Sequence, residues 1–322
     1  MKRLISVIAA IALAGGLAPA AAQDYPGKSI RIIVPFAPGG GSDFVARLVA
    51  AKLTTAVGQP VIVENRPGAN GQIGTEAVVK AAPDGYTLLF VTGSHVVNPA
   101  LFKSLPYDTA NDLAPISLLV TFPNVLVVHP SVPARNYAEL VALLKSKPRE
   151  FNAAIAQAGT LAHLTLIQIK SVSEVDFAMI PYKGSGQAVT DLLEGRVQLM
   201  SSSFPAVLQH IKSGRLRAIC VTSEKPAFAA PEIPACADVA GRGLVLSEWF
   251  GMFAPAKTPA PVIDRLQKEI KAVLVTREVS DRLQEQLSAE VVGSTPGEFG
   301  EFIKSELPKW VGALRRAGVE PE

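Results

Sequence analysis

Short apolar runs alternate with segments of helical periodicity along most of the chain, and this alternation constrains the fold more than any other feature. Several runs are apolar almost without interruption, which is typical of strands buried on both faces. Between them, residues 43–57, 136–146, 162–172, 186–194 and 204–213 show helical spacing of apolar side chains. We therefore expect an α/β architecture with mainly parallel sheets. The strand candidates are residues 30–35, 60–64, 87–92, 116–121, 124–129, 152–156, 176–180, 196–201 and 215–222.

Two strand-rich stretches, 116–129 and 245–254, are the nearest thing to domain boundaries, because no low-complexity linker divides the chain. The C-terminal part differs from the rest: residues 259–287 are typical of consecutive amphipathic helices, and 297–317 of another. A chain that crosses twice between two lobes would use such strand-rich stretches. The ligand would then lie in the cleft between the lobes.

The N-terminus has the three-part pattern of a secretory signal. Lys2 and Arg3 form a short basic start, residues 4–17 are apolar, and residues 20–22 are small alanines suited to a signal peptidase. The apolar segment is too short for a comfortable membrane span. We expect residues 1–22 to be a signal peptide that is removed from the mature protein, and a membrane anchor is the less favoured alternative.

Charge and cysteine content exclude several classes of protein. Without Lys2 and Arg3 the chain has 29 basic residues against 28 acidic ones, and no basic stripe is interleaved with aromatic residues. We therefore expect no nucleic-acid partner. Cys220 and Cys236 match no zinc or redox motif, and they are either one disulfide of an exported protein or buried free thiols.

A glycine-rich bend follows the first strand candidate and leads into a helical segment. Gly39, Gly40 and Gly41 lack the Lys of a phosphate-binding loop and the third Gly of a dinucleotide fingerprint, so a nucleotide is not expected. The bend can still present bare amides and a helix N-terminus to an anion, an interaction worth about 0.3–2 kcal/mol. Asp43 can cap the helix or orient a water molecule. A tight turn without any ligand remains the alternative.

Nothing in the sequence demands catalysis, a cofactor or a metal. The G-x-S-x-G motif is absent because Phe44 occupies the position of its last Gly. The four histidines are far apart and have no metal-ligand spacing. His163 either hydrogen-bonds a ligand or anchors a helix. A hydrolase that uses Ser42 or Ser185 with His163 is a remote alternative.

Three further loops follow strand candidates, where α/β sheets gather their ligands. They are 92–99, 156–163 and 181–188, and the last is a second Gly/Ser loop that opens a helix. Two such loops in different halves of the chain could face each other. Tyr182 and Lys183 could contribute a hydroxyl and a charge, or Lys183 is simply solvated.

Several motifs, in this order and spacing, resemble the Bug family, the extracytoplasmic solute receptors of tripartite tricarboxylate transport systems. The resemblance runs from about Tyr25 to the C-terminus. It rests on "IRIIVPFAPGGGSDFVARLVAAKL", "GQPVIVENRPGANGQIGTEAVVKAAPDGYTLL", "NPALF", "PYDTANDLAPISLLVTFPNVLVVHPSVPA", "HL" at 163–164, "IPYKGSGQAVTDLLEGRVQLM" and "WFGMFAPAKTPAPVIDRL".

The resemblance implies a type II periplasmic binding protein fold, in which two lobes close over a small carboxylated solute held by loop amides, hydroxyls and bridging waters. Residues 23–124 and 245–322 would form one lobe, and 125–244 the other. The protein would be periplasmic and monomeric, would not be an enzyme, and would deliver the solute to membrane permease subunits. An alternative partner is a membrane sensor kinase. The ligand-binding positions that match the family are Phe36, Gly39, Gly40, Asp43, Ser94, Gly159, Thr160, His163, Tyr182, Lys183 and Gly184.

The chain departs from the family pattern near the expected pocket. Gln157 stands where many relatives have Gly, and Leu161 replaces a small polar residue. Ligand identity therefore cannot be borrowed from a relative: a di- or tricarboxylate, an amino acid and an aromatic acid remain open.

Overall fold

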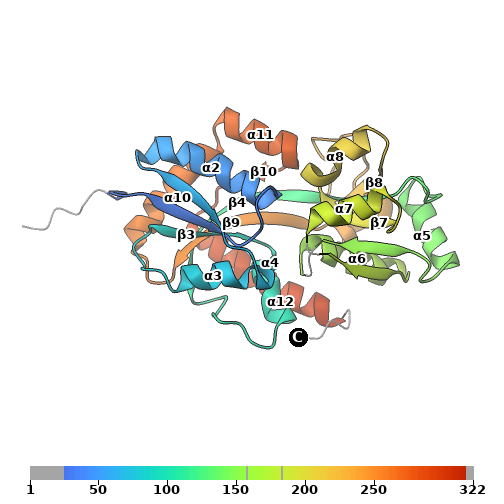
Figure 1. Ribbon diagram of the computed structural model, residues 1–322, viewed down its shortest axis with the longest axis horizontal. Helices are drawn as coiled ribbons and strands as arrows, with labels where there is room; N and C mark the ends of the chain where they lie inside the picture. The colour runs from blue at the N-terminus through green and yellow to red at the C-terminus, as the bar shows by residue number, and fades with distance from the viewer. Residues whose placement is uncertain (1–24, 157–158, 183, 317–322) are drawn as a thin grey trace, which may run out of the picture.

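The structure is a computed structural model that describes residues 25–156, 159–182 and 184–316. It confirms the α/β architecture, with strands and helices alternating in two halves that lie side by side (Figure 1). The first half begins with β1 (Ile30–Val34), α2 (Gly41–Val57), β2 (Val61–Asn65), the short 3-10 helix η1 (Ala69–Gly71), α3 (Gln72–Val79), β3 (Thr87–Thr92), α4 (Ser94–Leu101) and β4 (Leu113–Val128).

The second half follows β4, and the chain then returns to the first. The second half contains α5 (Tyr137–Ser146), β5 (Asn152–Ile155), α6 (Leu161–Ser173), β6 (Ala178–Pro181), α7 (Ser185–Leu193), β7 (Leu199–Ser203), α8 (Phe204–Lys212), β8 (Arg217–Val221), α9 (Cys236–Ala240) and η2 (Arg242–Leu244). The returning elements are β9 (Ser247–Pro255), α10 (Ala260–Leu274), α11 (Arg277–Leu287), β10 (Glu290–Val291) and α12 (Pro296–Arg316). The predicted lobe limits, 23–124 plus 245–322 and 125–244, stay a prediction.

The strands form a sheet in the order β2-β1-β3-β9-β4-β7-β5-β6, with β8 and β10 also paired to β4. The outer strands pair in parallel: β1 with β2 and β3 in the first half, and β5 with β6 and β7 in the second. Antiparallel pairs occur around β4 and β9, which run side by side through the middle of the molecule (Figure 1). Antiparallel pairing thus occurs where the chain crosses from the first half to the second and where it returns to the first.

The long strand β4 corrects one prediction, because 116–121 and 124–129 are not two strands but parts of one. Pro123 lies in its middle and pairs in register with Ser247 of β9, while Asn124 pairs with Ser203 of β7. Proline cannot donate a ladder hydrogen bond and is tolerated where a strand needs no donor. Here it lies where β4 leaves one partner strand and takes the next, so the strand continues through it.

Thr222 ties together three segments of chain at the junction of the two halves. Its buried hydroxyl donates to the Leu246 carbonyl at 2.7 Å and accepts from the Asn124 amide at 2.9 Å. Its own amide donates to the Asn124 carbonyl, and its carbonyl accepts from the Leu246 amide, each at 2.8 Å. The outgoing strand and the return segment are therefore hydrogen-bonded to one residue.

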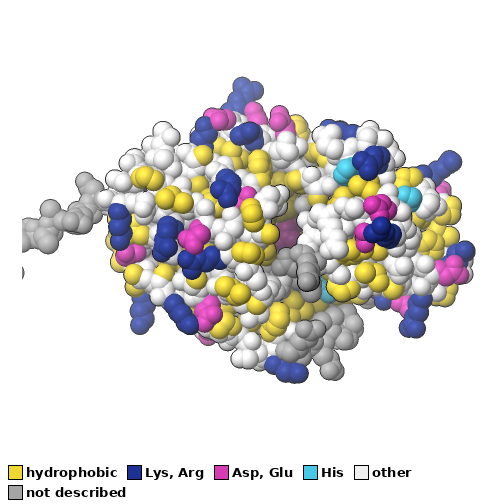
Figure 2. All heavy atoms as spheres, viewed as in Figure 1, with side chains coloured by type: hydrophobic (Ala, Val, Ile, Leu, Met, Phe, Trp, Pro, Cys, Tyr) yellow, Lys and Arg dark blue, Asp and Glu magenta, His cyan; other side chains and the backbone are white. Residues whose placement is uncertain are grey.

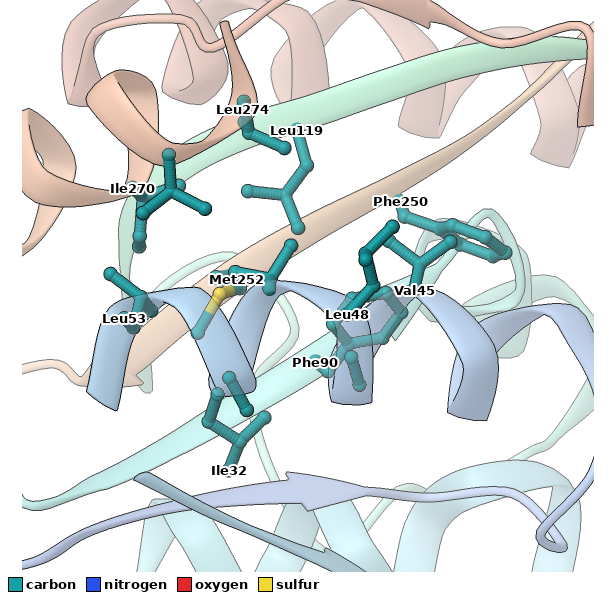
Figure 3. Packing of buried hydrophobic residues seen from close by; sticks show 14 of the residues in the cluster. Ile32, Val45, Leu48, Leu53, Phe90, Leu119, Phe250, Met252, Ile270 and Leu274 are labelled. Carbon is teal, nitrogen blue, oxygen red and sulfur yellow. The ribbon is translucent and has the colours of Figure 1, made fainter. Parts of the chain in front are cut away.

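The apolar face of α2 forms the core of the first half together with the sheet and α10. Figure 3 shows Val45, Leu48 and Leu53 of α2 packed among side chains of the strands and of α10. These three positions are spaced as one face of a helix requires, and all three are buried. This packing holds helix α2 in place. The glycine-rich bend leads into the N-terminus of this helix.

The core of the second half contains the disulfide Cys220–Cys236, which joins β8 to the first residue of α9. The sequence had left a disulfide and free thiols open, and the structure has the disulfide. No helix of the described residues is long and apolar enough to cross a membrane.

Candidate ligand-binding cleft

A cleft of about 460 Å³ lies between the two halves, and both contribute to its lining. Figure 2 shows the molecule hollowed between the halves, with acidic side-chain atoms at the floor of the hollow. Most lining residues are small, apolar or hydroxyl-bearing. They are Phe36, Ala37, Pro38, Gly39, Gly40, Gly41, Ser42, Thr92, Phe122, Asn124, Ala156, Thr160, Ala162, Gly184, Ser185, Gly186, Met200, Ser201, Ser202, Ser203, Glu248, Phe250 and Leu287.

Two helices from different halves begin at this cleft with glycine. Helix α2 starts after Gly40 and helix α7 after Gly184, and neither cap residue offers a side chain to the first amides. A Cβ added at either glycine would meet no atom within 4 Å, and both glycines line the cleft. Both N-termini thus present unshielded amides and partial positive charge to the same space.

Asp43 holds the glycine-rich loop before α2 in place through hydrogen bonds. Its carboxylate accepts from the Gly39 amide at 3.0 Å, from Arg47 Nε at 3.0 Å and from Asn65 Nδ2 at 2.9 Å. Burial alone would raise the pKa of Asp43, but these hydrogen bonds and the charge of Arg47 lower it below its usual value. Asn65 also donates to the Phe36 carbonyl at 3.1 Å. Asp43 does not line the cleft, and its contacts shape the loop that does.

The second loop carries Tyr182, whose hydroxyl is bonded to the helix that follows, α7. It donates to Asp191 at 2.8 Å, and Asp191 also accepts from Arg196. Burial and the neighbouring Asp191 raise the pKa of Tyr182 to about 12, so the phenol stays protonated at neutral pH. Tyr182 does not line the cleft, whereas the next described residue, Gly184, does. Lys183 lies outside the described residues.

The N-terminus of α6 is built by Thr160 and His163. The Thr160 hydroxyl caps the helix by accepting from the His163 amide, and His163 Nδ1 accepts from the Gly159 amide at 3.1 Å. Burial lowers the pKa of His163 to about 4, so the ring is neutral at neutral pH with Nδ1 free to accept. Thr160 lines the cleft, but Gly159 and His163 do not.

Ser94 lies one layer behind the lining. Its hydroxyl is 2.9 Å from that of Thr92 at the end of β3, and only Thr92 reaches the cleft. Of the predicted site residues, the structure therefore brings Phe36, Gly39, Gly40, Thr160 and Gly184 to one cleft. It places Asp43, Ser94, Gly159, His163 and Tyr182 outside the lining.

The serines at the end of β7 and Asn124 at the crossing of β4 line the cleft but were not predicted from the sequence. Ser201 is almost fully buried, lines the cleft, and its hydroxyl has no hydrogen-bond partner among the described residues. The run Ser201–Ser203 directly precedes a helix, which is the signal used for the other loops and could have found it. A buried hydroxyl without a partner is costly unless a ligand or water supplies one.

Glu248 of β9 is another lining residue that was not predicted. It is the only charged side chain in the described lining, and its Oε1 accepts from the Gly93 amide at 3.1 Å. Burial raises the pKa of Glu248, partly offset by backbone hydrogen bonds from Gly93, Trp249 and Leu161, while the nearby charge of Glu306 raises it further.

The described residues do not assemble a hydrolase or a metal centre. Ser42 and Ser185 line the cleft, but His163 does not, and its Nδ1 is taken by the Gly159 amide. No cluster of three metal-ligating side chains occurs among the described residues. The arrangement can hold an anion with amides and hydroxyls.

Comparison with known proteins decides the family. The model of the tripartite tricarboxylate transporter family receptor matches residues 45–319. The chain belongs to this receptor family. BugT of Bordetella pertussis is 40% identical over 325 residues, which cover 99% of each chain. The resemblance to the Bug family is thereby confirmed, and the protein is a solute-binding receptor and not an enzyme.

Solved structures of similar receptors have the same fold. The periplasmic binding protein BugD is 34% identical with a TM-score of 0.84, over 92% of this chain and all of its own. A Rhodopseudomonas palustris protein with adipate is 31% identical with a TM-score of 0.87, over 93% of this chain and all of its own. Both support the two-lobed receptor fold that the family implies.

Proposed function

We propose that this receptor is exported to the periplasm, captures a small organic carboxylate between its two halves and delivers it to membrane permease subunits. One observation carries the proposal: the glycine-led N-termini of α2 and α7, from different halves, line the same cleft. Helix N-termini are ready-made anion sites because their first amides lack intrahelical partners. The adipate bound by a structural relative is an anion of the same class.

The size and lining of the cleft suit a small solute. A volume of about 460 Å³ lies within the usual range of ligand pockets, roughly 300–1,000 Å³. Phe36, Phe122, Phe250 and Met200 offer apolar contact, while hydroxyls and amides supply the hydrogen bonds. A micromolar receptor needs about 8 kcal/mol in total, which two amide-rich loops and apolar contact can provide.

The predicted site residues divide into two roles in this proposal. Phe36, Gly39, Gly40, Thr160 and Gly184 contact the solute directly or through bridging waters, which bond nearly as well as direct partners. The remaining described positions, Asp43, Ser94, Gly159, His163 and Tyr182, hold those contacts in place. Lys183 keeps its predicted part in the facing loop. The mature receptor begins after residue 22 and acts as a monomer.

The test is a thermal-unfolding screen of the refolded mature protein against mono-, di- and tricarboxylates and amino acids, with scattering on each compound that binds. A solute at 100 times its dissociation constant adds about 2.7 kcal/mol, which raises the melting temperature by several degrees. Binding should also make the protein more compact. A screen without any response after refolding would overturn the proposal.

A pair of glycine variants makes the test specific to the cleft. Gly40→Leu adds a Cβ that meets no atom within 4 Å, at a glycine that lines the cleft, so we expect the variant to fold with its cleft partly filled. Gly297→Leu does the same on the exposed start of α12, far from the cleft lining. We expect binding to be lost in Gly40→Leu alone.

A further inference from the structure

Glu248 presents a carboxyl group to a cleft otherwise suited to carboxylates. It occupies the second position of β9, opposite Phe122 in register, and both side chains line the cleft. Gly93 is close beneath it: a Cβ at that position would lie 2.9 Å from Glu248 Oε1. The carboxyl group is therefore held against the backbone of the β3–α4 turn.

Burial raises the pKa of Glu248, whereas the hydrogen bonds around it stabilise its ionised form. The Gly93 and Trp249 amides donate to Oε1 at 3.1 and 3.4 Å, and the Leu161 amide also stabilises the charged form. These partners are all donors, and an ionised carboxylate only accepts. Two of the amides belong to the first half and Leu161 belongs to the second, so the carboxylate joins the halves within the lining of the cleft.

The described lining has no Lys or Arg, and the charged neighbour that acts on Glu248 is another acid, Glu306. An acid in such a setting favours a ligand that brings a positive group, because burial of unbalanced charge is costly.

The rest of the cleft lining favours a negatively charged group on the ligand. The N-termini of α2 and α7 offer amides, and the Ser201 hydroxyl, which has no partner among the described residues, can donate to an anion. The described lining of the cleft thus has anion-binding groups on both halves and one acid.

We propose that the solute is an amino-carboxylate, whose ammonium group donates to Glu248 while its carboxylate binds at the glycine-led helix N-termini. This inference rests on the proposed function and narrows its substrate class. A plain dicarboxylate would set its second carboxylate against Glu248, where like charges repel. Glu248 is thus the residue that selects for the amino group.

Matched probes that differ only in the amino group test the inference. Aspartate is compared with succinate, glutamate with glutarate, and leucine with 4-methylpentanoate, by calorimetry on the refolded protein at pH 7.5. We expect at least one amino acid to bind ten-fold or more tightly than its partner. Equal or tighter binding by the desamino partners would overturn the inference but leave the proposed function standing. A complete lack of binding by all six would count against both.

Glu248→Gln keeps an oxygen that can accept from Gly93 and removes the charge. We expect this variant to lose at least ten-fold in affinity for the amino acid and to lose the preference over the desamino partner. Glu301→Gln, an exposed acid on α12, is the matched control and should bind as the unmodified protein does. A Glu248→Gln protein that folds and keeps the preference would overturn the role of Glu248. If the variant does not fold, the paired comparison on the unmodified protein still decides the substrate class.

Discussion

The two glycine-led loops that face each other across the cleft are held in different ways. The loop before α2 is fastened directly: the Gly39 amide is bonded to Asp43 and the Phe36 carbonyl to Asn65. Before α7, the Tyr182 hydroxyl is bonded to Asp191 on the helix itself, and no described side chain bonds to the Gly184 amide. The second half has its cross-link elsewhere, in the disulfide between β8 and α9.

This difference indicates which loop is already held in place before the solute binds. A loop that is already ordered loses little conformational freedom on binding, so more of its interaction appears as affinity. We expect the α2 loop to be such a preformed half-site.

The largest effect is expected from removing the covalent cross-link of the second half. Replacing both Cys220 and Cys236 by Ser opens a loop with a sequence separation of 16, worth about 3 kcal/mol. Denaturant unfolding measures the loss. Solute affinity under native conditions should change little, because neither cysteine lines the cleft. A large loss of affinity in a folded variant would show that the disulfide also shapes the cleft.

The second-largest effect is expected at Asp43 in the first half, where one substitution should lower both the free energy of unfolding and the affinity for the solute. Asp43→Ala removes the acceptor shared by Gly39, Arg47 and Asn65, at a cost of about 2–3 kcal/mol. The Arg47 part is small because that side chain is half exposed. Unfolding and calorimetry should both report a loss. Asp281→Ala on α11, which removes an exposed ion pair, is the control. Unchanged affinity in Asp43→Ala would contradict a preformed α2 loop.

The third effect is a pH dependence of stability that is caused by His163, at the N-terminus of α6. The folded pKa of His163 is about 4 and the unfolded value about 6.5, so its contribution to stability is present above pH 6.5. That contribution falls as the pH drops from 6.5 towards 4, by about 1–2 kcal/mol at pH 5. His163→Asn keeps an acceptor for the Gly159 amide and does not titrate.

Urea unfolding at pH 7.5 and 5 compares the two proteins. The variant should lose less stability than the unmodified protein. Buried His95, with a pKa also near 4, leaves part of the acid sensitivity in both. His210→Asn on α8 is the control. An identical loss in His163→Asn and the unmodified protein would exclude His163 as a cause.

The smallest change in stability is expected at Ser201. Its hydroxyl has no described partner, so Ser201→Ala should leave unfolding unchanged or stabilise the free protein by up to about 1 kcal/mol. Affinity for the solute should fall about three- to ten-fold, if this hydroxyl serves the solute as proposed. Ser213→Ala, at the exposed end of α8, is the matched control. Unchanged affinity in Ser201→Ala would remove that contact from the second half.

Much of the fold could be predicted because local patterns determine it. The apolar run of β3 and the helical spacing of α2 each reflect burial that one segment shows by itself. Pro123 misled the prediction, since whether a strand needs a donor at that point depends on its partners in both halves. The disulfide could not be predicted either, because the distance between two cysteines is a property of the tertiary structure.

The site was predictable where glycine marks a loop that opens a helix, as at Gly40 and Gly184. Glu248 could not be recognised in the same way, because one acid at the start of an apolar strand has no distinctive pattern. Its place on the floor of the cleft depends on the pairing of β9 with β4 and on the approach of Gly93. Asp43 was predicted as a ligand-binding position, but its side chain is bonded to Arg47 and Asn65 and does not line the described cleft.

The hydrogen bonds of Thr222 have a mechanical consequence. Because the outgoing and returning segments are joined at this buried side chain, we expect it to act as a pivot when the halves move. The displacement of a residue during this movement then increases with its distance from Thr222. Residues beside it, such as Asn124, would keep their places, while the outer loops before α2 and α7 would travel furthest. A small bend at the junction would then be enough to open a wide entrance, and the rim would control the escape of the solute.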